Sequence, residues 1–281
     1  MNKITILIPS RNRPISLSRC LKSLNNHREY IGEVIVSNDS DKKYFEIYNK
    51  LAKKYNFELI EGPRKGLYAN HNYMYKKANF SHVRVVDDDH TFPKDHFKFC
   101  MEAIKKDPLC VWSIGEKYPK SEKVYFPREL NSRGFSSEIK SFDDNAALAC
   151  GSSIYPRSLF TEKKIFHIEN YKFGMTWLEY ALRIRKLGVK IKILTNTYVT
   201  HYYNKNNRSF NSTSIDLETK FFVILAHNFI YKKKFKNQFL GLYEILKELI
   251  FFKPIKLICL KNSIKVFFEL KKKGLWNFNI N

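Results

Sequence analysis

Three adjacent carboxylates, Asp87, Asp88 and Asp89, directly follow the β-branched run Val83–Val86. The run is typical of a short buried strand, so we expect the acids at the carboxyl end of that strand. Adjacent carboxylates repel one another, but hard cations such as Mg²⁺ and Mn²⁺ prefer these oxygen ligands and leave coordination positions open for phosphate. The segment therefore predicts either a metal site that binds a phosphorylated ligand or a plain acidic turn.

The first half of the chain alternates between strand and helix patterns. Continuous apolar runs predict strands, and apolar residues spaced three and four apart predict helices. The predicted strands cover residues 4–9, 33–37, 57–60 and 83–86, and the helices cover residues 17–24, 45–55 and 66–78 and a segment that begins near Pro93. Such alternation implies right-handed crossovers and a mostly parallel central sheet flanked by helices, which is an α/β fold.

Ligands of such sheets bind outside the carboxyl ends of the strands. Polar residues follow three of the predicted strands at this edge. Ser10, Arg11 and Asn12 follow the first strand, Asp39 follows the second, and the three acids follow the fourth. A chance acidic turn would not explain this convergence, so the pattern favours a binding site.

Phosphate at this site must be neutralised by a cation and by basic side chains, because neither a glycine-rich dinucleotide motif nor a P-loop is present. The basic candidates on loops at the same edge are Arg11, Arg13, Arg64 and Lys65. Each of them is alternatively a solvated surface charge. Asp39 is suited either to accept a hydrogen bond from a base or ribose or to cap the following helix.

The chain is strongly basic, with a formal net charge of +23 over 281 residues. We therefore expect acidic partners, such as nucleotide phosphates, anionic lipid headgroups or nucleic acid. Five scattered cysteines without a C-x-x-C pair favour a reducing compartment. No secretory signal precedes the first strand, and no apolar stretch reaches the ~18–20 residues that span a bilayer. These features predict a cytoplasmic protein.

The character of the chain changes near residue 211, so we expect two parts, residues 1–210 and residues 211–281. From Ile215 onward there are 13 Lys against 5 Asp or Glu, and apolar residues recur at helical spacing in segments 221–231, 240–252 and 255–270. Basic amphipathic helices suit the surface of an anionic membrane, on the inner face of the cytoplasmic membrane in this case. Alternatively, their apolar faces pack against the first part while the lysines remain solvated.

Several segments resemble the inverting, nucleotide-sugar-dependent glycosyltransferases of family 2, which have the GT-A fold. In chain order the similar segments are Ile6–Arg13, Val34–Ser40, Gly66–Asn72, Val85–Asp89, Ala149–Arg157, Trp177–Gly188 and Tyr198–His201. The resemblance covers about residues 3 to 203. It implies a GT-A, Rossmann-like domain followed by a C-terminal helical extension.

The resemblance also implies roles for individual residues. The implied donor-binding residues are Pro9, Ser10, Arg11, Asn12, Asp39, Lys65, Asn72, Asp87 and Asp88. The implied ligands of Mn²⁺ or Mg²⁺ are Asp89, Asp87 and His201.

The sequence departs from the family pattern at the catalytic base, because Thr176-Trp177 stands where the family often has Glu-Asp. Glu179 matches a second acid of the same helix and is the expected base; its alternative role is an ion pair with Arg183 at i+4. The other candidate bases are Glu169, Asp143 and Asp144.

The resulting expectation is an inverting glycosyltransferase that uses a nucleotide-diphosphate-sugar, with UDP favoured. The acceptor would be a saccharide or a lipid-linked saccharide in bacterial surface polysaccharide biosynthesis. One alternative is a nucleotidyltransferase of related fold, although the loop from Pro9 to Pro14 lacks the expected glycines. A nucleic-acid-binding protein would explain the charge but not the clustered acids.

Overall fold

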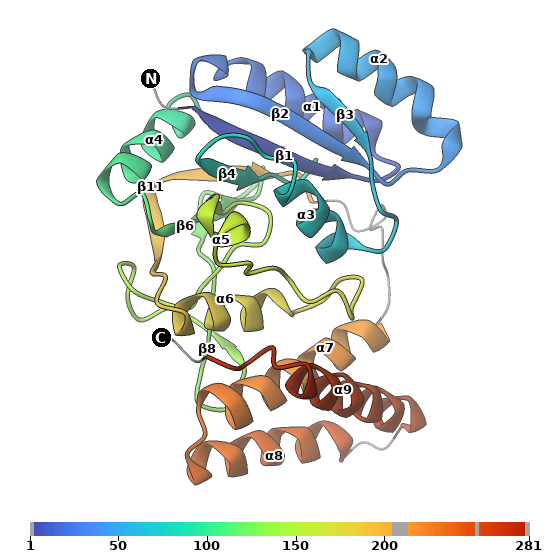
Figure 1. Ribbon diagram of the computed structural model, residues 1–281, viewed down its shortest axis with the longest axis vertical. Coiled ribbons are helices and arrows are strands. Elements are labelled where there is room, and N and C mark those ends of the chain that lie inside the picture. The colour runs from blue at the N-terminus through green and yellow to red at the C-terminus, as the bar shows by residue number, and fades with distance from the viewer. Residues whose placement is uncertain (1–2, 204–212, 251–252, 279–281) are drawn as a thin grey trace.

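A nine-stranded sheet forms the centre of the first part of the chain (Figure 1). The computed structural model describes residues 3–203, 213–250 and 253–278. The strand order is β3-β2-β1-β4-β10-β6-β11-β5, and β7 pairs with β6. The strands are β1 (Ile4–Ser10), β2 (Ile31–Asn38), β3 (Glu58–Glu61), β4 (His82–Val85), β5 (His90–Thr91), β6 (Val111–Lys117), β7 (Val124–Tyr125), β10 (Ile154–Pro156) and β11 (Ile191–His201). A separate two-stranded sheet contains β8 (Glu129–Leu130) and β9 (Ser136–Ser137).

The half of the sheet that carries the predicted strands is parallel. Strand β1 pairs in parallel with β2 and β4, and β2 pairs in parallel with β3. In the other half, β6 and β11 are parallel, whereas β10 runs antiparallel to both β4 and β6. The predicted α/β fold with a mostly parallel sheet is confirmed.

Helices cover both faces of the sheet because the side chains of each strand alternate in direction. Ile6 and Ile8 face the core beneath α1, α2 and α4, whereas Leu7 between them faces the core beneath α3, α5 and α6. The helices are α1 (Pro14–Asn25), α2 (Phe45–Tyr55), α3 (Leu67–Tyr75), α4 (His96–Lys106), α5 (Ser158–Thr161) and α6 (Trp177–Lys186), with short 3₁₀ turns at Arg28–Tyr30 and Lys42–Tyr44.

Three further helices form the end of the molecule opposite α1 and α2 (Figure 1). They are α7 (Thr213–Ala226), which continues as a π-helical turn at His227–Tyr231, α8 (Phe235–Leu249) and α9 (Pro254–Lys272). A third hydrophobic cluster joins α7 and α9 to Ile168, Tyr171 and Leu178 of the first part. The C-terminal helices therefore pack against the first part, as the alternative interpretation of their apolar faces predicts.

The predicted boundary between residues 210 and 211, like the predicted helix end at Phe252, lies outside the described residues, and the division into two parts stays a prediction. Among the described helices, none has both the length and the apolar character that crossing a membrane requires.

Candidate active site

A cavity of about 700 Å³ opens at the carboxyl ends of β1, β2 and β4. The loops that follow these strands form one wall, as the parallel topology predicts. The segment before α6 and the beginning of α7 form the opposite wall. The lining residues are Pro9, Ser10, Arg11, Arg13, Asp39, Ser40, Asp41, Arg64, Gly66, Leu67, Tyr68, Asn70, Asp87, Asp88, Asp89, Cys150, Lys172, Phe173, Gly174, Met175, Trp177, His201, Tyr203 and Asp216.

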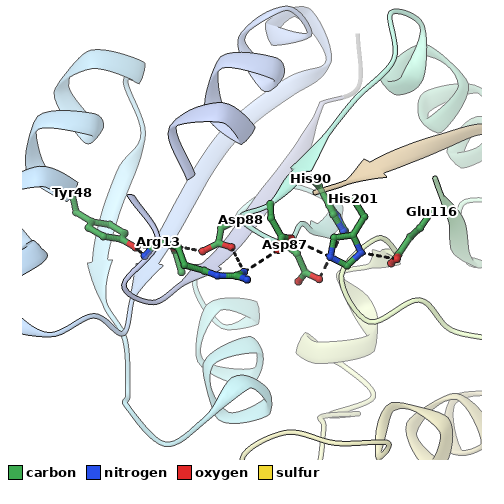
Figure 2. Close-up of polar contacts among 9 residues, drawn as sticks. Arg13, Tyr48, Asp87, Asp88, His90, Glu116 and His201 are labelled. Carbon is green, nitrogen blue, oxygen red and sulfur yellow. Dashed lines mark hydrogen bonds and ion pairs between the residues drawn. The ribbon is translucent and has the colours of Figure 1, made fainter. Parts of the chain in front are cut away.

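The acidic cluster lines this cavity. Hydrogen bonds hold its middle member, Asp88 (Figure 2). Asp88 is buried and accepts hydrogen bonds from Ser10 Oγ at 2.6 Å and from Arg13 Nη1 at 2.9 Å. The same Arg13 nitrogen lies 3.0 Å from Asp89 Oδ2. Arg13, one of the basic candidates for a diphosphate, therefore bridges two carboxylates and neutralises part of their charge.

The crowding of the acids changes their protonation. Burial raises the pKa of Asp87 to about 7, and the neighbouring charge of Asp89 adds to this effect. Burial also raises the pKa of Asp88 to about 6, although Arg13 opposes the shift. A cation near these groups would favour their ionised forms, because an opposite charge stabilises a carboxylate.

Strand pairing brings His201 to the acidic cluster. The two-residue strand β5 pairs antiparallel with the end of β11, so that His201 lies opposite His90. His201 Nε2 is 3.4 Å from Asp89 Oδ1, and the two imidazole rings have centroids 4.8 Å apart. Asp89, His90 and His201 each offer a ligand atom, and these atoms lie within 4.8 Å of one another.

The chemistry of this group fits a divalent cation. Both ring nitrogens of His90 are buried without a hydrogen-bond partner among the described residues, and the neighbouring Asp89 Oδ1 has an ion pair with His201 at 3.4 Å but no hydrogen bond. Leaving such groups unsatisfied costs free energy, and a bound cation would remove that cost. His201 Nδ1 lies 2.8 Å from Glu116 Oε2, and such a carboxylate commonly orients a metal-binding histidine (Figure 2).

The two histidines differ in protonation. Burial lowers the pKa of His90 to about 4, so its ring is neutral at pH 7. Burial acts in the same direction on His201, but Asp89 and Glu116 outweigh it and raise the pKa of His201 to about 10. The predicted ligands Asp89 and His201 therefore lie together, and His90 joins them. Asp87 Oδ2 lies 3.9 Å from His90 Nε2.

Asp39 lies where the loop after β2 lines the cavity. Its Oδ1 accepts a hydrogen bond from the backbone N–H of Arg64 at 3.0 Å, and the Asn70 side chain also bonds to it. Burial raises the pKa of Asp39. A Cβ on Gly62 would lie 2.0 Å from the same oxygen, so glycine permits this close packing.

Three of the predicted donor-binding residues do not line the cavity. Asn12 instead stabilises the loop after β1. Its side-chain amide donates a hydrogen bond to the Asp41 carboxylate and accepts one from the backbone N–H of Asp41. Lys65 is exposed outside the lining. Asn72 is buried and bonds the backbone of His167 through both its amide oxygen and its amide nitrogen. For these three residues, the structure supports positioning or surface roles rather than direct contact with a donor.

The predicted base Glu179 also lies outside the cavity lining. Its side chain is fully buried and is paired with Arg183, which is 3.1 Å from Oε1. The same oxygen accepts hydrogen bonds from Tyr231 Oη at 2.7 Å and from Trp276 Nε1 at 2.9 Å. A general base must reach the proton that it removes. This geometry fits the alternative role of Glu179 as the partner of Arg183, and its role as the base stays a prediction.

The alternative bases are no better placed. Glu169 is exposed and accepts a hydrogen bond from Asn72 at 2.8 Å. Asp143 and Asp144 are exposed, and Asp144 is paired with Arg185 at 2.8 Å. None of these three lines the cavity.

Asp216, which was not predicted from the sequence, does line the cavity. It lies in the first turn of α7, and the position of this turn is fixed by Thr219, whose Oγ1 accepts a hydrogen bond from the backbone N–H of Met175 at 3.1 Å. The charge of Asp216 also contributes to the raised pKa of the Tyr68 phenol, although burial is its main cause. The packing of α7 brings Asp216 to the cavity. A local sequence motif therefore could not have identified this residue.

Comparisons with known proteins agree with this architecture. No protein of curated function matches the chain in sequence. The crystal structure of GalNAc-T7 with UDP, GalNAc and Mn²⁺ superposes with a TM-score of 0.70 at 16% identity, covering 97% of this chain and 57% of that chain. The structure of S. aureus TarS 1-349 in complex with UDP-GlcNAc superposes with a TM-score of 0.59 at 17% identity, covering 97% of this chain and 92% of that chain.

These similarities show the GT-A fold. The sequence model of glycosyl transferase family 2 matches residues 5–162, which is more than half of the chain. The matched range contains the loops of Asp39 and of the acidic cluster and stops before α6. The chain belongs to glycosyl transferase family 2.

Proposed function

We propose that this protein transfers a sugar from a UDP-sugar to an acceptor hydroxyl with inversion at the anomeric carbon, and that it uses Mn²⁺ or Mg²⁺. One observation carries the proposal: Asp89 and His201 line the same cavity as Asp39, and the buried His90 offers a third ligand atom within 4.8 Å of theirs. Oxygen and imidazole ligands suit Mn²⁺ and Mg²⁺ when phosphate oxygens complete the coordination. The solved relatives that contain UDP or UDP-GlcNAc support UDP as the nucleotide.

The cavity supplies groups for each part of such a donor. Asp39 suits the nucleobase or ribose, as the family resemblance implies, and Asn70 and Arg64 keep its carboxylate in place. Arg11 and Lys172 line the cavity and bring positive charge for a diphosphate. A divalent cation bound by Asp89, His90 and His201, with Asp87 nearby, would stabilise the charge that develops on the departing UDP.

Asp216 is the best-placed base for this reaction. Among the described residues, six carboxylates line the cavity, and five of them, Asp39, Asp41 and Asp87 to Asp89, belong to the loops after β2 and β4. Among the described carboxylates of the cavity, Asp216 alone belongs to the wall formed by the segment before α6 and the beginning of α7. An acceptor that enters along this wall would meet its carboxylate. Its carboxylate has no hydrogen bond or ion pair among the described residues, in contrast to the fully engaged Glu179.

In the proposed step the acceptor hydroxyl attacks the anomeric carbon, and the bond between that carbon and the β-phosphate oxygen of UDP breaks. The hydroxyl proton passes to the carboxylate of Asp216. Attack on the face opposite the leaving group inverts the anomeric centre. Trp177, which stands where the family often has an acid, lines the same wall and offers a ring surface for an acceptor sugar.

We propose a saccharide or lipid-linked saccharide as the acceptor, in bacterial surface polysaccharide biosynthesis. The family resemblance supports this role. All five cysteines are free, which supports a site of action in the cytosol.

A nucleotide panel tests the proposal directly. We expect UDP and one UDP-sugar to raise the melting temperature in the presence of Mn²⁺, and chelation of the metal to abolish the shift. Slow release of UDP from that sugar nucleotide should accompany binding. Pyrophosphate release from a nucleoside triphosphate and a sugar phosphate would instead identify a nucleotidyltransferase, and stabilisation by nucleic acid alone would contradict both enzymatic functions.

A further inference from the structure

Helix α8 exposes a continuous apolar stripe. Its exposed large apolar residues recur at intervals of three and four, which places them on one face of the helix. They are Phe235, Phe239, Leu242, Tyr243, Leu246 and Ile250, directly after the helix, and their exposed fractions range from 48% at Leu242 to 83% at Phe235. Monomeric proteins rarely expose so many adjacent large apolar side chains, so the stripe needs a partner.

The stripe is distinct from the face that attaches α8 to the rest of the molecule. Gly241, Glu244 and Ile245 form the buried face. A Cβ on Gly241 would lie 2.7 Å from the Asn228 side chain, so this face is packed closely. Packing on the first part therefore explains only one side of the helix.

Helix α9 lies beside α8 (Figure 1). Its side chains are divided in the same way. Cys259, Ser263, Phe267 and Leu270 are buried, whereas Leu257, Ile258, Ile264 and Phe268 are exposed. We define the C-terminal apolar surface as the six α8 residues together with these four exposed α9 residues.

Positive charge surrounds the C-terminal apolar surface. The exposed lysines of this region are Lys232, Lys233, Lys234, Lys236, Lys247, Lys253, Lys261, Lys265, Lys271, Lys272 and Lys273. The acids of the same helices are already engaged: Glu244 is buried against Arg133, Glu248 pairs with Lys220, and Glu269 pairs with Lys273. The combined surface is therefore apolar and cationic.

We propose that α8 and α9 bind in the interface of a membrane rich in anionic phospholipid. Apolar side chains that enter the acyl boundary, with lysines at the level of the headgroups, are the features of interfacial helices. Each lysine near an anionic surface adds to the attraction. A second copy of this chain fits the surface less well, because its lysines would meet the lysines of the first copy. Peripheral binding also agrees with the absence of a membrane-crossing helix among the described residues.

Vesicle sedimentation tests this inference without any glycosyl transfer. The full chain should bind vesicles that contain phosphatidylglycerol, bind pure phosphatidylcholine vesicles much more weakly, and be released by high salt because salt screens the lysines. Leu246→Glu should weaken binding about tenfold or more, since an inserted leucine is replaced by a charge. The matched control is Leu109→Glu, which changes another exposed leucine far from α8 and should bind normally.

Three results would overturn the inference: equal binding to neutral vesicles in high salt, no binding to either vesicle, or a dimer in solution that Leu246→Glu converts to a monomer. The last result would assign the surface to a second copy. UDP-dependent thermal stabilisation, measured on the same variants, should be unaffected by either substitution. Its presence without vesicle binding would reject the membrane surface while leaving the proposed reaction intact.

Discussion

The indole Nε1 of Trp276 donates a hydrogen bond to Oε1 of Glu179, 2.9 Å away, across 97 positions of sequence. The carboxylate that the family resemblance marks as a base thus connects α6 to the C-terminal segment. Arg183 and Tyr231 bind the same carboxylate, so four side chains form one buried polar network. A network of this kind holds two parts of a protein in a defined arrangement when all its members are satisfied.

Glu179→Gln should therefore lower stability more than it lowers the rate. Removing one partner of a buried ion pair costs about 3–5 kcal/mol, because the charge of Arg183 would remain buried without its counter-ion. We expect this loss in urea unfolding, with kcat of the folded enzyme changed less than about tenfold, well short of the loss expected for a general base. Trp276→Phe is the matched control and should cost about 1 kcal/mol, since it removes one hydrogen bond. A large loss of kcat with unchanged stability would restore Glu179 as the base.

Asp216→Asn should lower the rate strongly and change stability little, the opposite of the effect expected for Glu179→Gln. Loss of a general base typically lowers the rate by about two to four decades. Stability and UDP binding should hardly change, because Asp216 is partly exposed and lies away from the loops after β2 and β4 that we propose to bind the nucleotide. Glu218→Gln, two positions along the same helix and outside the cavity lining, is the control for nonspecific effects on α7. Near-normal turnover by Asp216→Asn, measured as UDP release with acceptor present, would exclude Asp216.

The residues of the site differ in how far the sequence could predict their positions. Asp39 and Asp89 follow strands of a parallel sheet, and such strands end at one edge, so the sequence pattern was sufficient to bring them together. His90 depends on a two-residue strand that pairs with β11 more than 100 positions later. Asp216 depends on the packing of Thr219 against Met175, which no periodicity encodes. Long-range packing was the missing information in both cases.

Glu116→Gln should weaken metal binding without removing a ligand. Glu116 holds His201 Nδ1 at 2.8 Å and so directs Nε2 toward Asp89. Loss of such an orienting carboxylate typically costs about 10–100-fold in metal affinity. The concentration of Mn²⁺ needed for half-maximal activity should rise by that factor, and excess Mn²⁺ should restore activity. Asp89→Ala is the comparison and should not be rescued by excess metal. A Glu116→Gln enzyme with an unchanged Mn²⁺ requirement would argue against His201 as a ligand.

Binding of the cation should release a proton from His201. The carboxylates of Asp89 and Glu116 overcome the effect of burial and raise the pKa of His201 to about 10, so the free ring is protonated at pH 7, and a cation binds only the neutral ring. His90, with its pKa lowered to about 4 by burial, has no proton to release. Affinity should therefore rise as the pH increases from 7 toward 10.

Calorimetric titration with Mn²⁺ in two buffers of different ionisation enthalpy measures this release. At about pH 8.5, where Asp87 with its pKa of about 7 is already ionised, we expect roughly one proton per ion. His201→Gln should release none. An equal heat of binding in both buffers for the unaltered protein would mean that His201 keeps its proton and does not bind the metal.

Gly151→Ala should displace the carboxylate of Asp87 and lower the rate without destabilising the fold. A Cβ at residue 151 would lie 2.2 Å from the carboxyl carbon of Asp87, so one of the two must move. The obstructing atoms are the end of a flexible side chain, and rotation of Asp87 relieves the clash without disturbing β4. We expect a melting temperature within a few degrees of the unaltered protein and a rate about 10²-fold lower, the loss that a displacement of about 1 Å can cause in an active site. Asp87→Asn, which keeps the shape but removes the charge, shows how much of this loss comes from the carboxylate itself. If Gly151→Ala turns over normally while Asp87→Asn does not, the close approach of residue 151 is unimportant and Asp87 acts from more than one position.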